Sequence, residues 1–203
     1  MKKVVFVLVF VLAMCTVSYA APAIWADNGH TYDFIMASTS WHNARSFATS
    51  LGGYLTTITS ANENAFINSM FNTGSGSNFS WIGGQEPSDN GAWYWQTGPE
   101  AGNQFSNVKT PIAPYNYANW GGIEPNDHKA EEDYLIFNIG LSFAGIAAGQ
   151  WADANPTPSG LDPVVGYLVE WNPVQQNPVP EPMTMLLFGP ALLGLVGLKR
   201  RKV

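Results

Sequence analysis

The chain has 203 residues, of which 46% are hydrophobic and 12% are charged, and its formal net charge is −6. This length predicts one globular domain with short appendages, and an aromatic content of 13% excludes a chain that is disordered throughout. Six of the nine basic residues lie at the two ends, which leaves three basic residues against fourteen acidic ones in residues 24–172. Because such an acidic segment repels phosphate backbones, the composition predicts no nucleic-acid binding and favours a cation as ligand.

The N-terminal segment has the pattern of a secretory signal peptide. Two lysines precede an almost unbroken apolar run, 4–14, and small residues flank Tyr19. We therefore expect residues 1–20 to be a signal peptide that signal peptidase cuts after Ala20, so that the domain is exported across the inner membrane. A retained membrane anchor and a lipid attached at Cys15 are the alternatives. Cys15 is the only cysteine, so the mature domain must be held together by core packing without disulfides.

The C-terminal segment, 179–203, follows a linker at 173–178 that is rich in Pro, Gln and Asn. It holds the triplet Pro180-Glu181-Pro182, an apolar stretch of 16 residues and a basic tail. At 1.5 Å per residue the stretch covers about 24 Å, short of a ~30 Å hydrocarbon core, which suits a transient membrane tether. The segment closely resembles the PEP-CTERM sorting signal of Gram-negative bacteria. That resemblance implies a short transmembrane helix, processing by an exosortase-type peptidase and release to the cell surface or extracellular matrix. An ordinary single-span anchor is the alternative.

Between these ends, the pattern predicts two helices followed by short strands. Ser40 can cap a helix that ends at Gly52-Gly53, and Ser60 with Glu63 forms a capping box at the start of a second helix that reaches Phe71. The first helix carries apolar residues at helical spacing, namely Trp41, Ala44, Phe47, Ala48 and Leu51. Strands are expected at 54–58, 81–83, 93–95, 134–137, 150–152 and 167–171, with long loops at 98–128 and 153–163. This order of elements predicts an α+β domain.

An acidic loop, 124–133, is the strongest candidate for a binding site. It contains five carboxylates and the side-chain amide of Asn126, and such oxygens are the ligands that Ca²⁺ prefers. Pro125 can hold the side chains of Glu124 and Asn126 on one side, especially through a cis peptide bond. Asp153, on a later strand, is the nearest candidate to complete the site. A solvated acidic turn is the alternative that this loop alone leaves open.

The sequence motifs of residues 24–172, taken in chain order, strongly resemble those of a C-type lectin-like domain. The resemblance is carried by Trp41-His42-Asn43-Ala44-Arg45, Leu51-Gly52-Gly53-Tyr54-Leu55, Glu63, Trp81-Ile82-Gly83-Gly84, Gly91-Ala92-Trp93-Tyr94-Trp95, Tyr117-Ala118-Asn119-Trp120, Glu124-Pro125-Asn126, Trp151-Ala152-Asp153 and Gly166-Tyr167-Leu168-Val169-Glu170. It implies two helices with short antiparallel sheets and a long loop region. Ala48, Tyr134 and Val169 stand where the family typically has cysteines, and apolar residues there can fill the same volume.

The resemblance also implies a site. The principal Ca²⁺ ligands would be Glu124, Asn126, Glu132 and Asp153, and the bound ion would take the vicinal equatorial hydroxyls of mannose, glucose or N-acetylglucosamine, with fucose also able to fit. Ala152 replaces the Asn that the family has there, which removes one Ca²⁺ ligand and one hydrogen-bond donor to the sugar. An auxiliary Ca²⁺ site would use Glu86, Asn90, Asp127 and Asp133, together with Glu132. Asn155 is a possible substitute for the missing amide.

These features predict an exported carbohydrate-binding protein of the bacterial cell surface or exopolysaccharide matrix, dependent on Ca²⁺, and not an enzyme. Trp120 is the candidate for stacking on a sugar, whereas Trp81, Trp93 and Trp151 are expected in the core. A structural matrix protein with a degenerate site is the alternative, favoured by Ala152. Glycoside hydrolysis by Glu131 and Glu132 is a third hypothesis. Adjacent residues of a strand point to opposite faces, however, so these two carboxylates would not share one scissile bond.

Overall fold

The computed structural model describes residues 22–76, 78–128, 131–158 and 163–173. The predicted signal peptide with Ala20 lies outside these residues, as do most of the predicted linker and the whole predicted sorting signal with Pro180, Glu181 and Pro182. No helix among the described residues is long and apolar enough to cross a membrane. The transmembrane helix expected near the C-terminus falls in the part that is not described.

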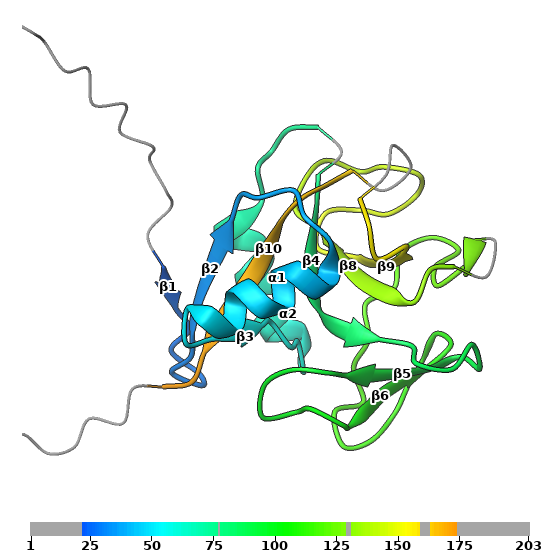
Figure 1. Cartoon of the computed structure of the whole chain (residues 1–203), viewed down its shortest axis with the longest axis horizontal. Coiled ribbons are helices and arrows are strands. Elements are labelled where there is room, and N and C mark those ends of the chain that lie inside the picture. The colour runs from blue at the N-terminus through cyan, green and yellow to red at the C-terminus, as the bar shows by residue number, and fades with distance from the viewer. Residues whose placement is uncertain (1–21, 77, 129–130, 159–162, 174–203) are drawn as a thin grey trace, which may run out of the picture. The chain divides into compact units, whose positions relative to one another are not determined.

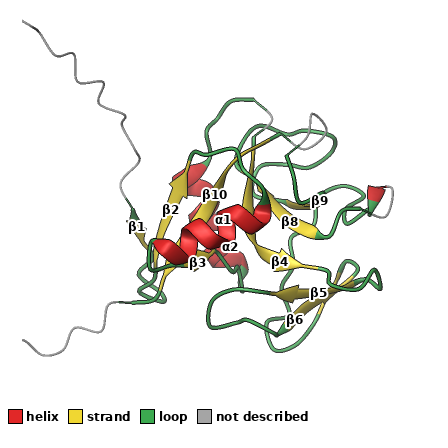
Figure 2. Cartoon of the chain, viewed as in Figure 1, coloured by secondary structure: helices red, strands yellow, loops and turns green. Residues whose placement is uncertain are grey.

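The described part contains two helices and ten strands (Figures 1 and 2). The helices are α1 (Trp41–Ser50) and α2 (Ala61–Phe71). The strands are β1 (Ala23–Ile24), β2 (Thr31–Ile35), β3 (Tyr54–Leu55), β4 (Phe79–Gln85), β5 (Ala92–Trp95), β6 (Gln104–Asn107), β7 (Thr110–Pro111), β8 (Tyr134–Asn138), β9 (Trp151–Ala154) and β10 (Val164–Trp171). Two helices with a strand-rich second half confirm the predicted α+β class.

All ten strands belong to one mixed sheet with a branch at β4. The main path runs β1-β2-β10-β4-β5-β6-β7, while β3 pairs with β10, and β8 joins β4 to β9. β10 is antiparallel to β2 and β3 but parallel to β4, so the C-terminal strand of the domain lies in the middle of the sheet. β8 and β9 are antiparallel, and their connection lies on the same side of the domain as the acidic loop (Figure 1).

Both helices begin where their caps predict. The Ser40 hydroxyl accepts from the Asn43 N–H at 3.3 Å, and the Ser60 hydroxyl accepts from the Glu63 N–H at 3.2 Å. The expected apolar face of α1 is partly wrong. Trp41, Ala44 and Ala48 are buried, but Phe47 and Leu51 are each 50% exposed, because a helix turns about 100° per residue and Phe47 lies well round from Trp41.

The capping box of α2 is only half formed. The Glu63 carboxylate accepts from the N–H of Thr59, one residue before the cap, at 2.8 Å, and from the Tyr32 hydroxyl at 2.6 Å. The Tyr32 contact turns Glu63 toward the core, where only 2% of it is exposed. Glu63 therefore joins α2 to β2 and does not close its own cap.

The strand predictions hold for the central strands and fail at the periphery. Four strands were not predicted, namely β1, β2, β6 and β7, and the last two lie in the expected loop at 98–128. The strand expected at 54–58 is limited to Tyr54–Leu55, although residues 56–58 remain buried. β6 and β7 form a small antiparallel ribbon on β5, which tertiary pairing stabilises in a segment of weak local preference.

The core contains the tryptophans that were expected there and fills the positions of the missing cysteines. Trp81, Trp93 and Trp151 have no exposed surface. Ala48, Tyr134 and Val169 all lie in one cluster of buried apolar residues. Packing of ordinary apolar side chains thus takes the place of cross-links in this domain.

Candidate functional site

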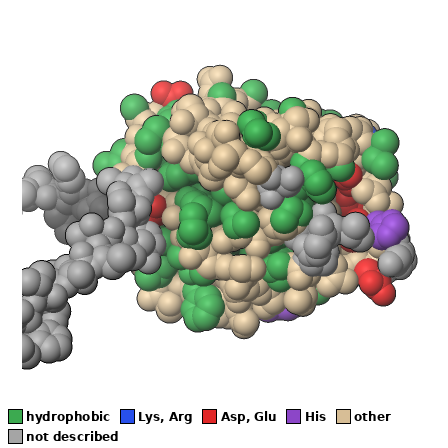
Figure 3. Space-filling view, turned by 90° about the horizontal axis from the view of Figure 1, so that it is seen from above, with side chains coloured by type: hydrophobic (Ala, Val, Ile, Leu, Met, Phe, Trp, Pro, Cys, Tyr) green, Lys and Arg blue, Asp and Glu red, His purple; other side chains and the backbone are tan. Residues whose placement is uncertain are grey.

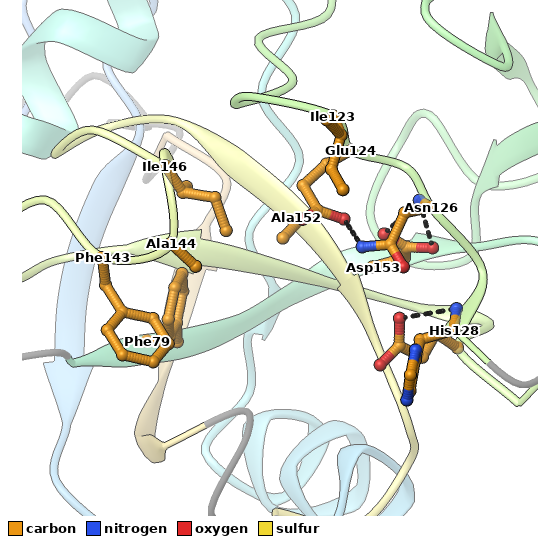
Figure 4. A pocket seen from close by; sticks show the side chains of 11 residues that line it. Phe79, Ile123, Glu124, Asn126, His128, Phe143, Ala144, Ile146, Ala152 and Asp153 are labelled. Atoms are coloured by element: carbon orange, nitrogen blue, oxygen red, sulfur yellow. Dashed lines mark hydrogen bonds between the residues drawn. The ribbon is translucent and has the colours of Figure 1, made fainter.

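The four predicted principal ligands come together at one cavity of about 360 Å³. Glu124 and Asn126 reach it from the acidic loop, Glu132 from the end of that loop, and Asp153 from β9. Figure 4 shows Glu124, Asn126 and Asp153 at one end of the cavity and a group of apolar side chains at the other. In the space-filling view, acidic side chains gather beside a histidine at one end of the molecule (Figure 3).

The first residues of the acidic loop hold the side chains of Glu124 and Asn126 close together. The peptide bond between Glu124 and Pro125 is cis. The Asn126 side-chain amide donates a hydrogen bond to the Glu124 carboxylate, so both side chains lie on the same side of the loop. The loop is also tied to its own base, since the Glu124 N–H donates to the Gly121 carbonyl at 2.8 Å.

Two carboxylates hold the backbone of this loop. Asp153 accepts from the Asn126 N–H with both oxygens at 3.0 Å and from the Asp127 N–H at 2.6 Å. Glu132 accepts from the His128 N–H at 3.0 Å. Hydrogen bonds from backbone N–H groups to a carboxylate are stronger than those between neutral partners. β9 therefore fixes the position of the residues that would bind a ligand.

The polar end of the cavity gathers three carboxyl groups in a buried place. Glu124, Glu132 and Asp153 are all buried, with 5%, 8% and 2% of their surfaces exposed. Burial, reinforced by the neighbouring Asp153 carboxylate, raises the pKa of Glu124 to about 8. Among the described residues the Lys and Arg side chains are Arg45 and Lys109, and each donates to a backbone carbonyl. A bound cation would stabilise the ionised forms of these carboxyl groups and lower the pKa of Glu124.

The donor set fits a hard cation, but the side chains are not gathered around a common point. No group of three or more acidic or histidine side chains in the described ranges is arranged to hold a metal ion. The oxygens face backbone and amide N–H groups instead. Carboxylate and amide oxygens match Ca²⁺ chemistry, and neither a thiol nor a pair of histidines lines the described cavity, as a softer metal would require.

Ala152 leaves the gap that the sequence predicts. Its side chain is buried in the cavity wall beside Asp153. Asn155 does not fill the gap, because its amide oxygen accepts from the Thr157 N–H at 3.3 Å within its own turn. The cavity thus has a methyl group where an amide would have supplied both a ligand and a donor.

The structure brings together part of the set predicted for the auxiliary site. A second cavity of about 170 Å³ is lined by Glu86, Asp127 and Asp89 among others. Burial, together with Asp89, Glu86 and Asp127, raises the pKa of Asp133 to about 6, which places Asp133 beside the same group. Asn90 turns away and accepts from the Ala92 N–H at 3.0 Å. Asp89, one position before the predicted Asn90, lines this cavity and was not predicted.

Trp120 is not a stacking platform at this cavity. Its indole N–H donates to the Ser106 hydroxyl at 3.1 Å, and its ring packs at 4.9 Å from the ring of Trp93. The ring is half-buried in the aromatic core and does not line the described cavity. Trp120 therefore lies outside the lining of the cavity at which the other predicted sugar-binding residues meet.

The fold and this site define a C-type lectin domain. Residues 37–157 match the Lectin C-type domain family, and the chain belongs to this family. Halomucin of Haloquadratum walsbyi (strain DSM 16790 / HBSQ001) is 36% identical over 122 residues, which are 57% of this chain and 1% of halomucin. The galactose-specific lectin nattectin of Thalassophryne nattereri is 26% identical, over 61% of this chain and 70% of nattectin. The mouse scavenger receptor C-type lectin carbohydrate-recognition domain shares the fold, with a TM-score of 0.52, 20% identity, and coverage of 74% of this chain and 93% of that domain.

Proposed function

We propose that this protein binds carbohydrate in the cavity beside the acidic loop, with Ca²⁺ as cofactor. One observation carries the proposal: Glu124, Asn126, Glu132 and Asp153, which are up to 29 positions apart, line a single cavity in a chain of a carbohydrate-binding family. Nattectin, a relative, is named as a galactose-specific lectin. Three buried carboxyl groups in one cavity also favour a bound cation, which would stabilise their ionised forms.

The residues of this site would bind both the ion and the sugar hydroxyls. Glu124, Asn126, Glu132 and Asp153 would hold Ca²⁺, which when bound supplies open coordination positions for two vicinal hydroxyls. The Glu124 carboxylate can accept a hydrogen bond from a sugar hydroxyl, and the Asn126 amide can donate one. The hydrogen bond that joins these two side chains keeps them at the same edge of the cavity. Ala152 contributes no hydrogen bond, which lowers the affinity expected for a single site.

The proposed activity is binding without turnover. Glu131 is exposed, whereas Glu132 is buried and lines the cavity, so the two carboxylates face different surroundings. The proposed place of action is the bacterial cell surface or exopolysaccharide matrix, reached by export and by processing of a tail that resembles a sorting signal. Many copies on one polymer would raise the avidity of a weak single site.

A glycan array tests this function. The purified protein is applied with millimolar Ca²⁺ and with chelator, on an array that includes the host's own exopolysaccharide. Binding that chelator abolishes is expected, and Glu124→Gln should lose it because Gln removes the charge while keeping the shape. Glu131→Gln is the matched control, since Glu131 lies in the same loop but is exposed and outside the cavity.

The second candidate is a structural or adhesive matrix protein that uses the same fold for protein–protein contact. Ala152 favours it, because the site lacks one ligand and one donor. This alternative predicts that neither Ca²⁺ nor any glycan changes the thermal midpoint of the protein, and that Glu124→Gln behaves like the unmodified chain on the array.

A further inference from the structure

The cavity at the acidic loop has an apolar half that sugar hydroxyls would not satisfy. Its lining includes six apolar side chains, namely Phe79, Ile123, Phe143, Ala144, Ile146 and Ala152. Phe79 and Ile146 are buried and Ala144 is exposed, whereas the buried Ala152 and the 74% exposed Ile123 lie nearer the acidic residues (Figure 4). Figure 4 shows the Phe79, Phe143, Ala144 and Ile146 side chains grouped at the end away from Asn126 and Asp153.

A tight turn in the connection between β8 and β9 builds one wall of this half. Phe143 and Ile146 pair across the turn, with hydrogen bonds of 2.8 and 3.0 Å between their backbones. Ala144 and Gly145, at the tip, have φ angles of +50° and +84°. This geometry is typical of a two-residue turn with both central residues left-handed. The backbone hydrogen bonds of this turn therefore fix the shape of the wall.

The wall is packed against the rest of the cavity on both sides. The Phe143 ring lies 6.2 Å from the ring of Phe79, edge to face. A Cβ added at Gly121 would lie 2.8 Å from Ile146 Cγ2, so the turn presses directly on the backbone that leads into the acidic loop. The apolar half and the predicted diol-binding half are thus parts of one rigid cavity.

The chemistry of the two halves differs, and that difference selects ligands. A hydroxyl placed against the apolar wall would lose its hydrogen bonds to water and gain none, which is unfavourable. A methyl group in the same place would gain from leaving water. A ligand that satisfies both halves has vicinal hydroxyls at one edge and an apolar group at the other.

We propose that the cavity selects sugars that carry a methyl-terminated substituent beside the diol, as an acetyl group or as the methyl of a deoxy sugar. The inference rests on the proposed function, because the diol half must bind first. It adds a preference among vicinal diols that the acidic residues alone do not set. Burial of one methyl group is expected to tighten binding about fourfold.

Matched sugars test the proposal with the purified protein in millimolar Ca²⁺. Glucose, 6-deoxyglucose and N-acetylglucosamine share the same equatorial 3,4-diol, and the last two carry the methyl group in different places. Titration calorimetry should show at least one of them binding about fourfold or more tightly than glucose. The one that does identifies whether the methyl comes from a deoxy position or an acetyl group.

Two variants at Ala144 show whether the wall is responsible. Asn and Gly both suit the left-handed backbone there better than Ala, so neither is expected to destabilise the turn. Ala144→Asn places an amide in the apolar half and should abolish the preference, whereas Ala144→Gly should keep it. Equal affinity for all three sugars, or a preference that Ala144→Asn leaves intact, would overturn this inference alone. No binding of any sugar would overturn the proposed function and the inference with it.

Discussion

The Asp153 carboxylate accepts hydrogen bonds from the Asn126 N–H with both of its oxygens, each at 3.0 Å. Asp153 lies on β9 and Asn126 in the acidic loop, so this contact joins a buried strand to a segment that is largely exposed. The same carboxylate also accepts from the Asp127 N–H. Asp153 therefore holds the loop in place whether or not it binds an ion.

Asp153→Ala is expected to destabilise the protein by about 1–3 kcal/mol even in chelator, because the N–H groups of Asn126 and Asp127 lose a charged acceptor. Chemical denaturation in chelator measures this structural role apart from any ion binding. Glu131→Ala, in the exposed part of the same loop, should change the free energy of unfolding by less than about 0.5 kcal/mol. Equal stability of the two variants would show that Asp153 does not organise the loop.

Ala152→Asn tests whether the missing amide limits Ca²⁺ binding. An added oxygen ligand worth about 1 kcal/mol would lower the Ca²⁺ concentration at half-saturation about fivefold, read from the thermal midpoint as a function of Ca²⁺. Ala144→Asn is the control, since it adds the same amide to the opposite wall of the same cavity. If both variants respond to Ca²⁺ like the unmodified protein, position 152 is not beside the ion.

The starts of the helices and the central strands could be predicted because their signals are local. Ser40 and Ser60 cap helices through their own side chains, and the buried strands are short apolar runs between turn residues. The outer strands lack such signals. β2 is stabilised by pairing with β10, whose residues lie more than 130 positions further along the chain, and nothing within Thr31–Ile35 indicates that partner.

The candidate site was predictable only in part for the same reason. Glu124 and Asn126 are close in sequence, but Asp153 reaches them only through the pairing of β8 with β9. Asp89 and Asn90 differ by one position in a turn, and the choice between them depends on backbone angles, with φ of +40° at Asp89. The apolar wall formed by Phe143 and Ile146 could not be predicted from the sequence. Apolar residues in a loop form such a wall only through tertiary packing, which local sequence does not indicate.

Gly121→Ala is expected to destabilise the protein by about 1–3 kcal/mol through overpacking, since the new Cβ would lie 2.8 Å from Ile146 Cγ2. The double variant with Ile146→Ala removes that methyl group. Its loss of stability should be smaller than the total of the two single losses, because the shortest contact with the new Cβ is absent. Additive losses in chemical denaturation would show that Gly121 and Ile146 do not press on each other.

Stability is expected to fall as pH rises from about 4.5 to 8, because a buried network between β2, α2 and β10 holds protons in the folded state. Burial raises the pKa of Glu63 from 4.5 to about 6. The hydrogen bond to Glu170 raises the pKa of His30 above 6.5, and burial raises the pKa of Glu170. A group whose pKa is higher in the folded state stabilises the fold below its unfolded pKa and loses that contribution as pH rises through the folded value.

Two variants separate the contributions in this network. Glu63→Gln imitates the protonated acid and should remove about 2 kcal/mol of the fall between pH 4.5 and 6. His30→Gln keeps a donor for Glu170 without titrating, so it should reduce the fall above pH 6.5 and leave the lower part intact. The rest of the fall in that range is expected from Glu124, whose pKa is raised to about 8. The measurement is the free energy of unfolding in chelator at half-unit steps of pH. If the difference between the unmodified protein and Glu63→Gln does not change from pH 4.5 to 6, folding does not raise the pKa of the Glu63 carboxyl.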